Sequence, residues 1–231
     1  MGYLGRWLLW TFALVALALL LLQAWYAVHI WWWRDHAPRE TAFMALRLVE
    51  IRARHPDARV AYIWTPYERI SVQLKRAMIA AEDAKFVEHE GFDWDGIQQA
   101  MEKNARRGHV VAGGSTITQQ LAKNLFLSSQ RSYWRKSEEA LITLMLEAML
   151  DKRRIFELYL NVIEWGEGIF GSEAAAERYY GVGASALTAE QAARLAAMAP
   201  NPRYYERHPG APGLARKIQI ILARMPAAEL P

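Results

Sequence analysis

The sequence predicts a mainly helical domain that follows a membrane-spanning N-terminal helix. In most segments after residue 70, apolar residues recur at the three- and four-residue intervals of a helix. Before them lies a long run without charged residues, and residues 60–65 have the composition of a strand or an extended arm. The chain of 231 residues is long enough for one well-buried domain beyond the apolar run. It contains no cysteine, which excludes disulfides and thiolate metal sites.

The apolar run covers residues 7–33, which include no Asp, Glu, Lys or Arg. As a helix it is roughly 40 Å long, enough to cross a bilayer with tilt. Tryptophan and tyrosine flank both ends, as in the aromatic belts of membrane helices. The apolar core of a cleaved signal peptide is shorter, about 7–15 residues. We therefore expect residues 1–35 to form a retained single-pass anchor, and deletion of residues 1–33 to leave a folded domain.

The charges around the anchor predict its orientation. Arg6 and the N-terminal amine lie on one side, whereas Arg34 on the other side is offset by Asp35. This favours a cytoplasmic N-terminus, with the domain outside. Residues 36–65 are expected to connect the anchor to a domain of residues 66–231. The connection is predicted to be partly helical, with an apolar face made of Phe43, Leu46 and Val49.

The first candidate for chemistry is Glu82, which follows a helical apolar stripe in residues 70–81. If this helix continues to Gly91, Glu82 and Lys85 share one face. Apolar neighbours can raise the pKa of a carboxylic acid toward neutrality, as a general base requires. The alternative is an ordinary Glu–Lys surface pair. His89 on the same face is expected to pack or hydrogen-bond rather than to catalyse.

The second candidate is the segment of residues 113–125, which begins with two glycines. Ser115 or Thr116 offers a hydroxyl N-cap for a helix, whose free amides would add an anion site. Its predicted faces are an apolar stripe of Ile117, Leu121 and Leu125 and a polar stripe of Thr116, Gln120 and Lys123. The polar stripe fits a phosphate-bearing, hydroxyl-rich ligand, and it fits equally a solvated helix face.

Residues 93–107 also have two interpretations. Trp94, Ile97 and Met101 lie at helical spacing before several basic residues. This pattern is found in helices at an anionic lipid surface and in core helices that end in a basic loop.

Arg131, Arg135 and Glu139 are predicted to share one side of a helix, opposite an apolar face of Leu141, Leu144, Met145 and Ala148. Arg135 and Glu139 would form a helix salt bridge worth about 0.2–0.5 kcal/mol. Alternatively, Arg131 would join Lys123 in clamping a diphosphate.

The remaining segments are predicted from helix caps and turns. A helix begins at Lys152, with Ile155, Leu158, Tyr159 and Val162 buried. Thr188 and Gln191 form a capping box that opens a helix ending near Pro200. Residues 200–213 are expected to be a turn region, followed by a helix to about Met225.

Five segments together resemble the motifs of the peptidoglycan glycosyltransferases, which polymerise the lipid-linked disaccharide lipid II. The matching residues are, in chain order, Glu82-Asp83 with Phe86, His89 and Gly91; Gly113 to Gln120 with Lys123 and Asn124; Arg135-Lys136 with Glu139; Lys152 with Ile155, Glu157 and Tyr159 to Asn161; and Ala199 to Pro202. The resemblance covers about residues 66–209. Phe156 departs from it, since the family usually has leucine there.

The resemblance implies an all-α, lysozyme-like domain with a large lobe and a smaller membrane-apposed lobe. It implies an inverting transfer with Glu82 as general base and Glu139 as a second acid that positions a cationic cluster or a divalent ion. The residues it assigns to substrate and diphosphate are Lys85, Ser115, Thr116, Gln119, Gln120, Lys123, Arg131 and Arg135. No obligatory cofactor is expected, although Mg²⁺ or Mn²⁺ is compatible with the site.

The expected partners are lipid II, the growing lipid-linked glycan, the bacterial inner membrane and cell-wall synthesis complexes, with no nucleic acid. No Ser-x-x-Lys occurs, so no transpeptidase domain is expected. Two alternatives are a lysozyme-like lytic enzyme, which needs no diphosphate clamp, and a non-catalytic membrane-anchored scaffold.

Overall fold

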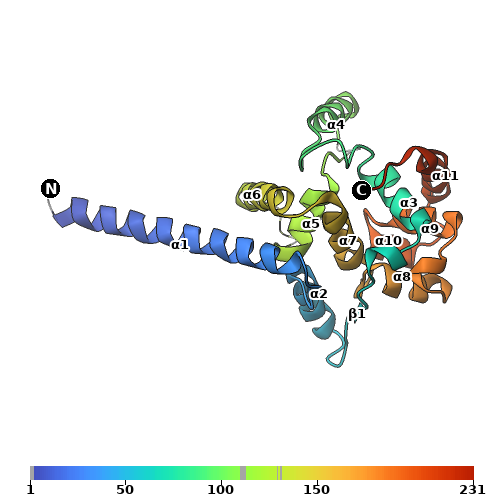
Figure 1. Cartoon of the computed structure of the whole chain (residues 1–231), viewed down its shortest axis with the longest axis horizontal. Helices are drawn as coiled ribbons and strands as arrows, with labels where there is room; N and C mark the ends of the chain where they lie inside the picture. The colour runs from blue at the N-terminus through green and yellow to red at the C-terminus, as the bar shows by residue number, and fades with distance from the viewer. Residues whose placement is uncertain (1–2, 110–112, 129, 131) are drawn as a thin grey trace.

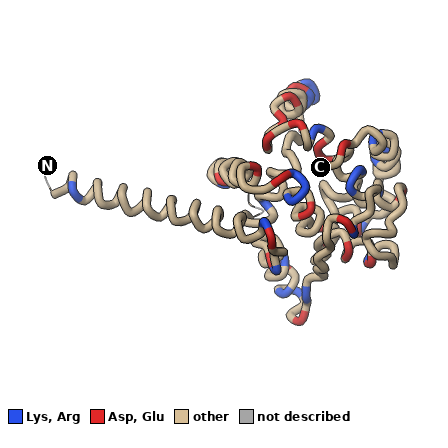
Figure 2. The backbone as a smooth tube through the Cα atoms, in the orientation of Figure 1, with Lys and Arg blue, Asp and Glu red and all other residues tan. Residues whose placement is uncertain are grey.

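The computed structural model describes residues 3–109, 113–128, 130 and 132–231. Its first helix, α1 (Tyr3–Trp33), extends away from the rest of the molecule as a long rod (Figure 1). Figure 2 shows basic colouring near its N-terminus, where the sequence has Arg6, and then no charged residue along its length. The helix is long and apolar enough to cross a membrane, which fits the predicted single-pass anchor.

The domain behind the anchor is helical, as predicted. Its helices are α2 (Ala42–Arg52), α3 (Val72–Glu82), α4 (Trp94–Arg107), α5 (Ile117–Phe126), α6 (Tyr133–Met149), α7 (Lys152–Val162), α8 (Ser172–Tyr180), α9 (Ala189–Met198), α10 (Pro202–Arg207) and α11 (Leu214–Arg224). The 3₁₀ turns in the part of the chain that the structure describes are η1 (Tyr67–Arg69), η2 (Ala184–Ala186) and η3 (Met225–Ala227).

The helices pack in two groups, which form the two lobes of the lysozyme-like domain. In one, α3, α9 and α11 pack against one another. In the other, α5 packs against α2, α6 and α7, and α6 also contacts the anchor α1. Figure 1 shows α5 and α7 near the centre and α4 apart from both groups. The predicted apolar stripes of α5 and α7 are confirmed, since Ile117, Leu121, Ile155 and Leu158 are fully buried.

A small sheet joins the connecting segment to the domain. β1 (Ala61–Tyr62) pairs in parallel with β3 (Ile169–Phe170), which pairs antiparallel with β2 (Glu164–Gly166). The sequence left open a strand or an extended arm in residues 60–65, and the structure has a two-residue strand there, whereas the β2–β3 hairpin was not predicted. Thr65, at the end of this segment, is held by Asn161 of α7, whose amide bonds both main-chain polar groups of Thr65 at 2.8 and 2.9 Å.

The predicted apolar face of α2 is confirmed only in part, since Phe43 packs against the core and Val49 does not. Val49 is 69% exposed, whereas Met44, Arg47 and Ile51 are buried. The orientation of α2 follows from a buried ion pair, in which Arg47 Nε lies 2.7 Å from Glu164 Oε1 on β2. A charged residue this deep in a protein needs a partner, and that requirement overrides the apolar periodicity.

Two further expectations about helices need correction. The predicted apolar face of α6 is largely exposed, with Leu141 and Leu144 at 47% and 52%, and only Met145 of this face packs against the core. Ile142, Thr143 and Leu146 are buried instead. The turn region after Pro200 contains the short helix α10, which the proline at its first position favours. The helices α9 and α11 end close to where the sequence predicted.

Candidate functional site

Glu82 is the last residue of α3, so this helix does not continue to Gly91. The chain leaves the helical conformation at Asp83, where φ is −162° and ψ is 77°. The carboxylate of Asp83 accepts hydrogen bonds from the main-chain N–H of Ile117 at 3.0 Å and from His89 Nε2 at 2.9 Å. These bonds turn the chain toward α5, so Glu82 is brought to the gap between the lobes. His89 is a hydrogen-bonding residue, as predicted.

The N-terminus of α5 is occupied by groups of the protein itself. The Asp83 carboxylate accepts a hydrogen bond from the main-chain N–H of Ile117, and the Thr116 hydroxyl accepts one from the main-chain N–H of Gln119 at 3.2 Å. The expected anion site on free amides is therefore wrong, since an internal carboxylate fills that position. Thr116 is the N-cap and Gln119 closes its capping box, so both residues hold the start of the helix. Ser115 remains exposed.

Gly91 fixes the loop between the first two motifs. Its carbonyl oxygen accepts the Thr116 hydroxyl at 2.7 Å, and its φ of +85° is a left-handed conformation that favours glycine. A Cβ at this position would lie 2.7 Å from Thr143 Cγ2, so a larger residue is also sterically excluded. The loop therefore depends on glycine for both conformation and space.

The carboxylate of Glu82 is held from the opposite lobe. Its Oε2 accepts a hydrogen bond from Gln120 Nε2 at 2.8 Å, and Gln120 Oε1 accepts the hydroxyl of Tyr159 at 3.2 Å. Burial raises the pKa of Glu82, while the Gln120 hydrogen bond and the nearby cations Lys123 and Lys217 act to lower it. The effect of burial is the larger, so the pKa of Glu82 is raised. The raised pKa expected for a general base is thus present.

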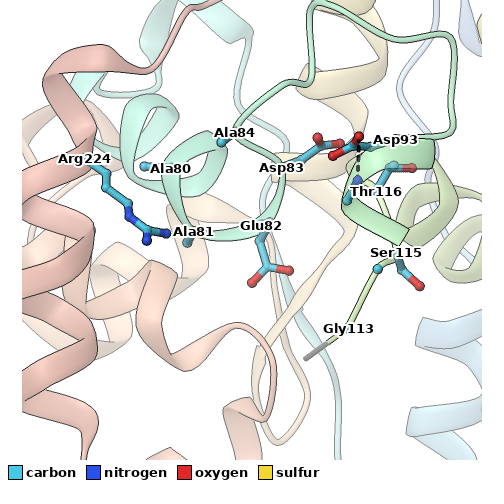
Figure 3. A pocket seen from close by; sticks show the side chains of 12 residues that line it. Ala80, Ala81, Glu82, Asp83, Ala84, Asp93, Gly113, Ser115, Thr116 and Arg224 are labelled. Atoms are coloured by element: carbon cyan, nitrogen blue, oxygen red, sulfur yellow. Dashed lines mark hydrogen bonds between the residues drawn. The ribbon is translucent and has the colours of Figure 1, made fainter. Parts of the chain in front are cut away.

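A cavity opens beside Glu82 between α3, the start of α4 and the loop before α5 (Figure 3). In this view Ser115 lies to one side of the Glu82 carboxylate and Arg224 of α11 extends from the other. A second cavity shares Glu82 and Arg224 and adds Lys217, also from α11. The sequence interpretation missed both cations. Their seven-residue spacing, which places them on one face of a helix, was the available signal.

A cationic cluster of Lys123, Arg135 and Lys136 surrounds Glu139. Arg135 lies 2.7 Å from a Glu139 oxygen, Lys136 pairs with the other oxygen, and Glu139 is buried. Burial lowers the pKa of Lys123, which feels the charges of Glu139, Arg135 and Glu82. Among the described residues, no carboxylate lies within ion-pair distance of Lys123. The cluster has a net positive charge, so it suits an anionic ligand.

The other predicted binding residues are distributed as follows. Lys85 pairs with Asp95 of α4 at 3.1 Å and does not line the two cavities at Glu82. Arg131 lies outside the described residues. A third cavity contains Gln120, Lys123, Asn124 and Asn201, which brings the second and fifth motifs together. In the parts of the chain that the structure describes, no three His, Asp or Glu side chains gather as a metal site requires.

Comparisons with known proteins agree with this geometry. The family described as transglycosylase matches residues 50–226. A biosynthetic peptidoglycan transglycosylase of Dechloromonas aromatica is 62% identical over 235 residues, covering all of both chains. Its counterpart in Methylobacillus flagellatus is 62% identical, covering 97% of this chain and 98% of the relative. That of Chromobacterium violaceum is 61% identical and covers 95% and 96%. The chain belongs to the transglycosylase family and is a peptidoglycan glycosyltransferase.

Proposed function

We propose that this enzyme polymerises lipid II into β-1,4-linked glycan strands, with inversion at the anomeric carbon and Glu82 as the general base. The donor is the growing glycan on a polyprenyl diphosphate, and the acceptor is lipid II. The observation that carries the proposal is the position of Glu82, a half-buried carboxylate with a raised pKa that has cations on both sides.

The chemistry needs one displacement. The acceptor 4-hydroxyl forms a bond to the donor's anomeric carbon while the bond from that carbon to the diphosphate oxygen breaks. Glu82 takes the hydroxyl proton, and the polyprenyl diphosphate leaves with the bonding electrons. An α-linked donor then yields a β-linked product in one step, so no enzyme nucleophile is needed.

The cations fit the two lipid diphosphates of this reaction. Lys123, with Arg135 and Lys136, is suited to the leaving diphosphate because charge builds up there in the transition state. Lys217 and Arg224 line the cavity on the other side of Glu82 and are suited to the diphosphate of the acceptor. Arg135 Nε is buried without a hydrogen-bond acceptor, which also supports an anionic ligand at the cluster.

Glu139 has a positioning role in this scheme. Its two oxygens hold Arg135 and Lys136, and its own charge is offset by them. A carboxylate with two cationic partners is a poor ligand for a further divalent ion. We therefore propose that the cationic cluster, rather than a metal bound at Glu139, neutralises the leaving group.

The membrane explains the exposed apolar side chains. Trp134, Leu141 and Leu144 form an exposed stripe on α6, which packs against the anchor α1. Trp94 and Met101 on α4 are also exposed, which favours the interfacial over the core interpretation of that helix. We propose that these surfaces lie in the outer leaflet of the bacterial inner membrane, with the domain on the periplasmic side, where both polyprenyl substrates are anchored.

Incubation of the detergent-solubilised full chain with radiolabelled lipid II tests the proposal. We expect a long polymer that lysozyme degrades, and none from the Glu82→Gln variant. A lytic enzyme would instead cleave added glycan strands and would not need Lys123. A scaffold would do neither. Formation of no polymer, together with cleavage of added strands, would overturn the proposed function.

A further inference from the structure

Tyr159 is a buried side chain that the proposed mechanism does not use, although its hydroxyl lies two hydrogen bonds from the Glu82 carboxylate. It is fully buried on α7, in the last turn of the helix. Its hydroxyl donates to Gln120 Oε1 at 3.2 Å, and the same amide donates from Nε2 to Glu82 at 2.8 Å. Gln120 is therefore a bridge between α7 and the proposed base.

The direction of this bridge depends on Tyr159. The two ends of a glutamine amide have the same shape, but only the NH₂ end can donate to a carboxylate. A tyrosine hydroxyl next to the oxygen end gives that end a donor. If the amide turned over, its oxygen would face Glu82 and its NH₂ group would lose the carboxylate as a partner. The Tyr159 hydroxyl thus favours the orientation in which Gln120 donates to Glu82.

The surroundings hold Tyr159 in place and keep its proton. Its ring stacks on Phe156 with a centroid distance of 6.3 Å, and Phe156 in turn contacts Phe86 at 5.5 Å. Burial raises the pKa of Tyr159 well above its usual value, with Glu82 and Asp83 acting in the same direction. The hydroxyl therefore remains a donor at every pH at which the enzyme is assayed.

We propose that Tyr159 is a positioning residue for the transfer reaction, which orients the Gln120 amide so that it donates to the Glu82 carboxylate and stabilises its basic form. The inference rests on the proposed role of Glu82 as general base. Loss of the Tyr159 hydroxyl frees the amide, weakens the donor to Glu82 and disfavours the ionised carboxylate. The pKa of Glu82 then rises, so a higher pH is needed to ionise the base. The acid limb of the rate profile therefore moves to higher pH.

The experiment compares initial rates of lipid II polymerisation by the detergent-solubilised full chain from pH 5 to 9. For Tyr159→Phe we expect the acid limb of kcat to move up by about 0.5 to 1 pH unit, the size that one weakened hydrogen bond supports. At alkaline pH, where Glu82 is fully ionised in both proteins, the rate of the variant should return close to that of the unmodified protein. Tyr179→Phe is the matched control, because that hydroxyl donates to the main-chain oxygen of Trp165 at 2.8 Å, away from the site. Its acid limb should not move.

A double-mutant cycle separates positioning from packing. Gln120→Ala removes the bridge, so we expect its acid limb to move in the same direction and Tyr159→Phe to add no further shift in that background. A full additional shift would mean that Tyr159 acts through packing and would overturn the proposal. Should Tyr159→Phe fail to fold, Gln120→Asn shortens the bridge while leaving the tyrosine in place. An unmoved acid limb in that variant would also overturn it.

The Glu82→Gln variant distinguishes the two proposals. If it is inactive while the acid limb of Tyr159→Phe is unmoved, only the role of Tyr159 is wrong. If it polymerises at the normal rate with an unchanged acid limb, the base lies elsewhere and both proposals fail.

Discussion

Arg154 of α7 donates a hydrogen bond from Nε to the main-chain oxygen of Trp33, the last residue of the anchor helix, at 2.8 Å. A second guanidinium nitrogen donates to the main-chain oxygen of His36 at 2.7 Å. The last carbonyls of a helix have no partner within it, and a cation there also complements the helix dipole. Arg154 therefore fastens the anchor to the same helix that carries Tyr159.

Loss of Arg154 should loosen the anchor without unfolding the domain. We expect Arg154→Ala to broaden the distribution of distances between spin labels at Leu21→Cys on α1 and Ser137→Cys on α6, in protein reconstituted into nanodiscs. The absence of native cysteine makes these two labels unique. Arg153→Ala is the matched control, since Arg153 is half exposed and pairs with Glu68. Equal distributions in both variants would show that Arg154 does not hold the anchor.

The end of the anchor belongs to the folded core, so two truncations should differ. Tyr26, Ile30 and Trp33 are at most 8% exposed, and Tyr26 and Trp33 pack on Phe126 of α5. Burying one such side chain contributes about 1.5–3 kcal/mol. Deletion of residues 1–24 should therefore preserve the domain's melting temperature in detergent, whereas deletion of residues 1–33 should lower it clearly.

This expectation replaces the simpler one from the sequence, that the whole apolar run can be removed. Thermal unfolding followed by circular dichroism measures the difference between the two truncations. Equal melting temperatures would mean that the contacts of Tyr26, Ile30 and Trp33 with the domain do not stabilise it.

How much the sequence predicted depended on whether the deciding interaction is local. The capping box of Thr188 and Gln191 and the buried face of α7 follow from neighbours within one helix, and both were predicted. The end of α3 at Glu82 was not, because the carboxylate of Asp83 bonds a main-chain amide 34 residues away. Periodicity likewise could not predict that Arg47 is buried, since its partner Glu164 is 117 residues away.

The same distinction applies to the site. Motif matching found Glu82, Lys123 and Glu139, and the structure places them around one gap. It did not find Lys217 and Arg224, which lie in a helix outside the matched motifs and reach Glu82 only through the packing of α11 on α3. The contact of Tyr159 with Gln120 also joins two helices, so no spacing within one segment could predict it.

Lys123→Ala should weaken the interaction with the leaving diphosphate. A charge-assisted contact of this kind is worth about 1.5–3 kcal/mol, or about 10- to 150-fold in kcat/KM for lipid II. Lys103→Ala on α4 is the control, because Lys103 is exposed and its substitution removes the same charge from the protein. Steady-state kinetics of both variants measure the effect. Equal kcat/KM values would remove Lys123 from the site.

Glu82→Gln and Glu139→Gln should separate the base from the positioning residue. Each change keeps the size of the side chain and removes its ability to carry a negative charge. Loss of a general base typically costs about 10²–10⁴ in rate, so polymerisation by Glu82→Gln should fall by that order. Binding of the lipid diphosphate should survive in this variant, because Lys123 and Arg135 are unchanged.

Glu139→Gln should act through its cationic partners instead. Without the carboxylate, Arg135 and Lys136 lose the group that holds them at the cluster, so we expect a larger effect on KM for the donor than on kcat. Its acid limb should stay in place, since Glu82 still titrates. In the unmodified enzyme the rate should fall about tenfold for each pH unit below the raised pKa of Glu82, because only the ionised carboxylate accepts the proton.

The two variants are compared in the lipid II assay at several pH values, after circular dichroism has shown that both are folded. A Glu82→Gln enzyme that polymerises at nearly the normal rate, beside an inactive Glu139→Gln enzyme, would assign the base to the other carboxylate. The geometry argues against that outcome. Glu139 already holds two cations, Arg135 and Lys136, whereas Glu82 has one neutral donor, a cavity beside it and a raised pKa.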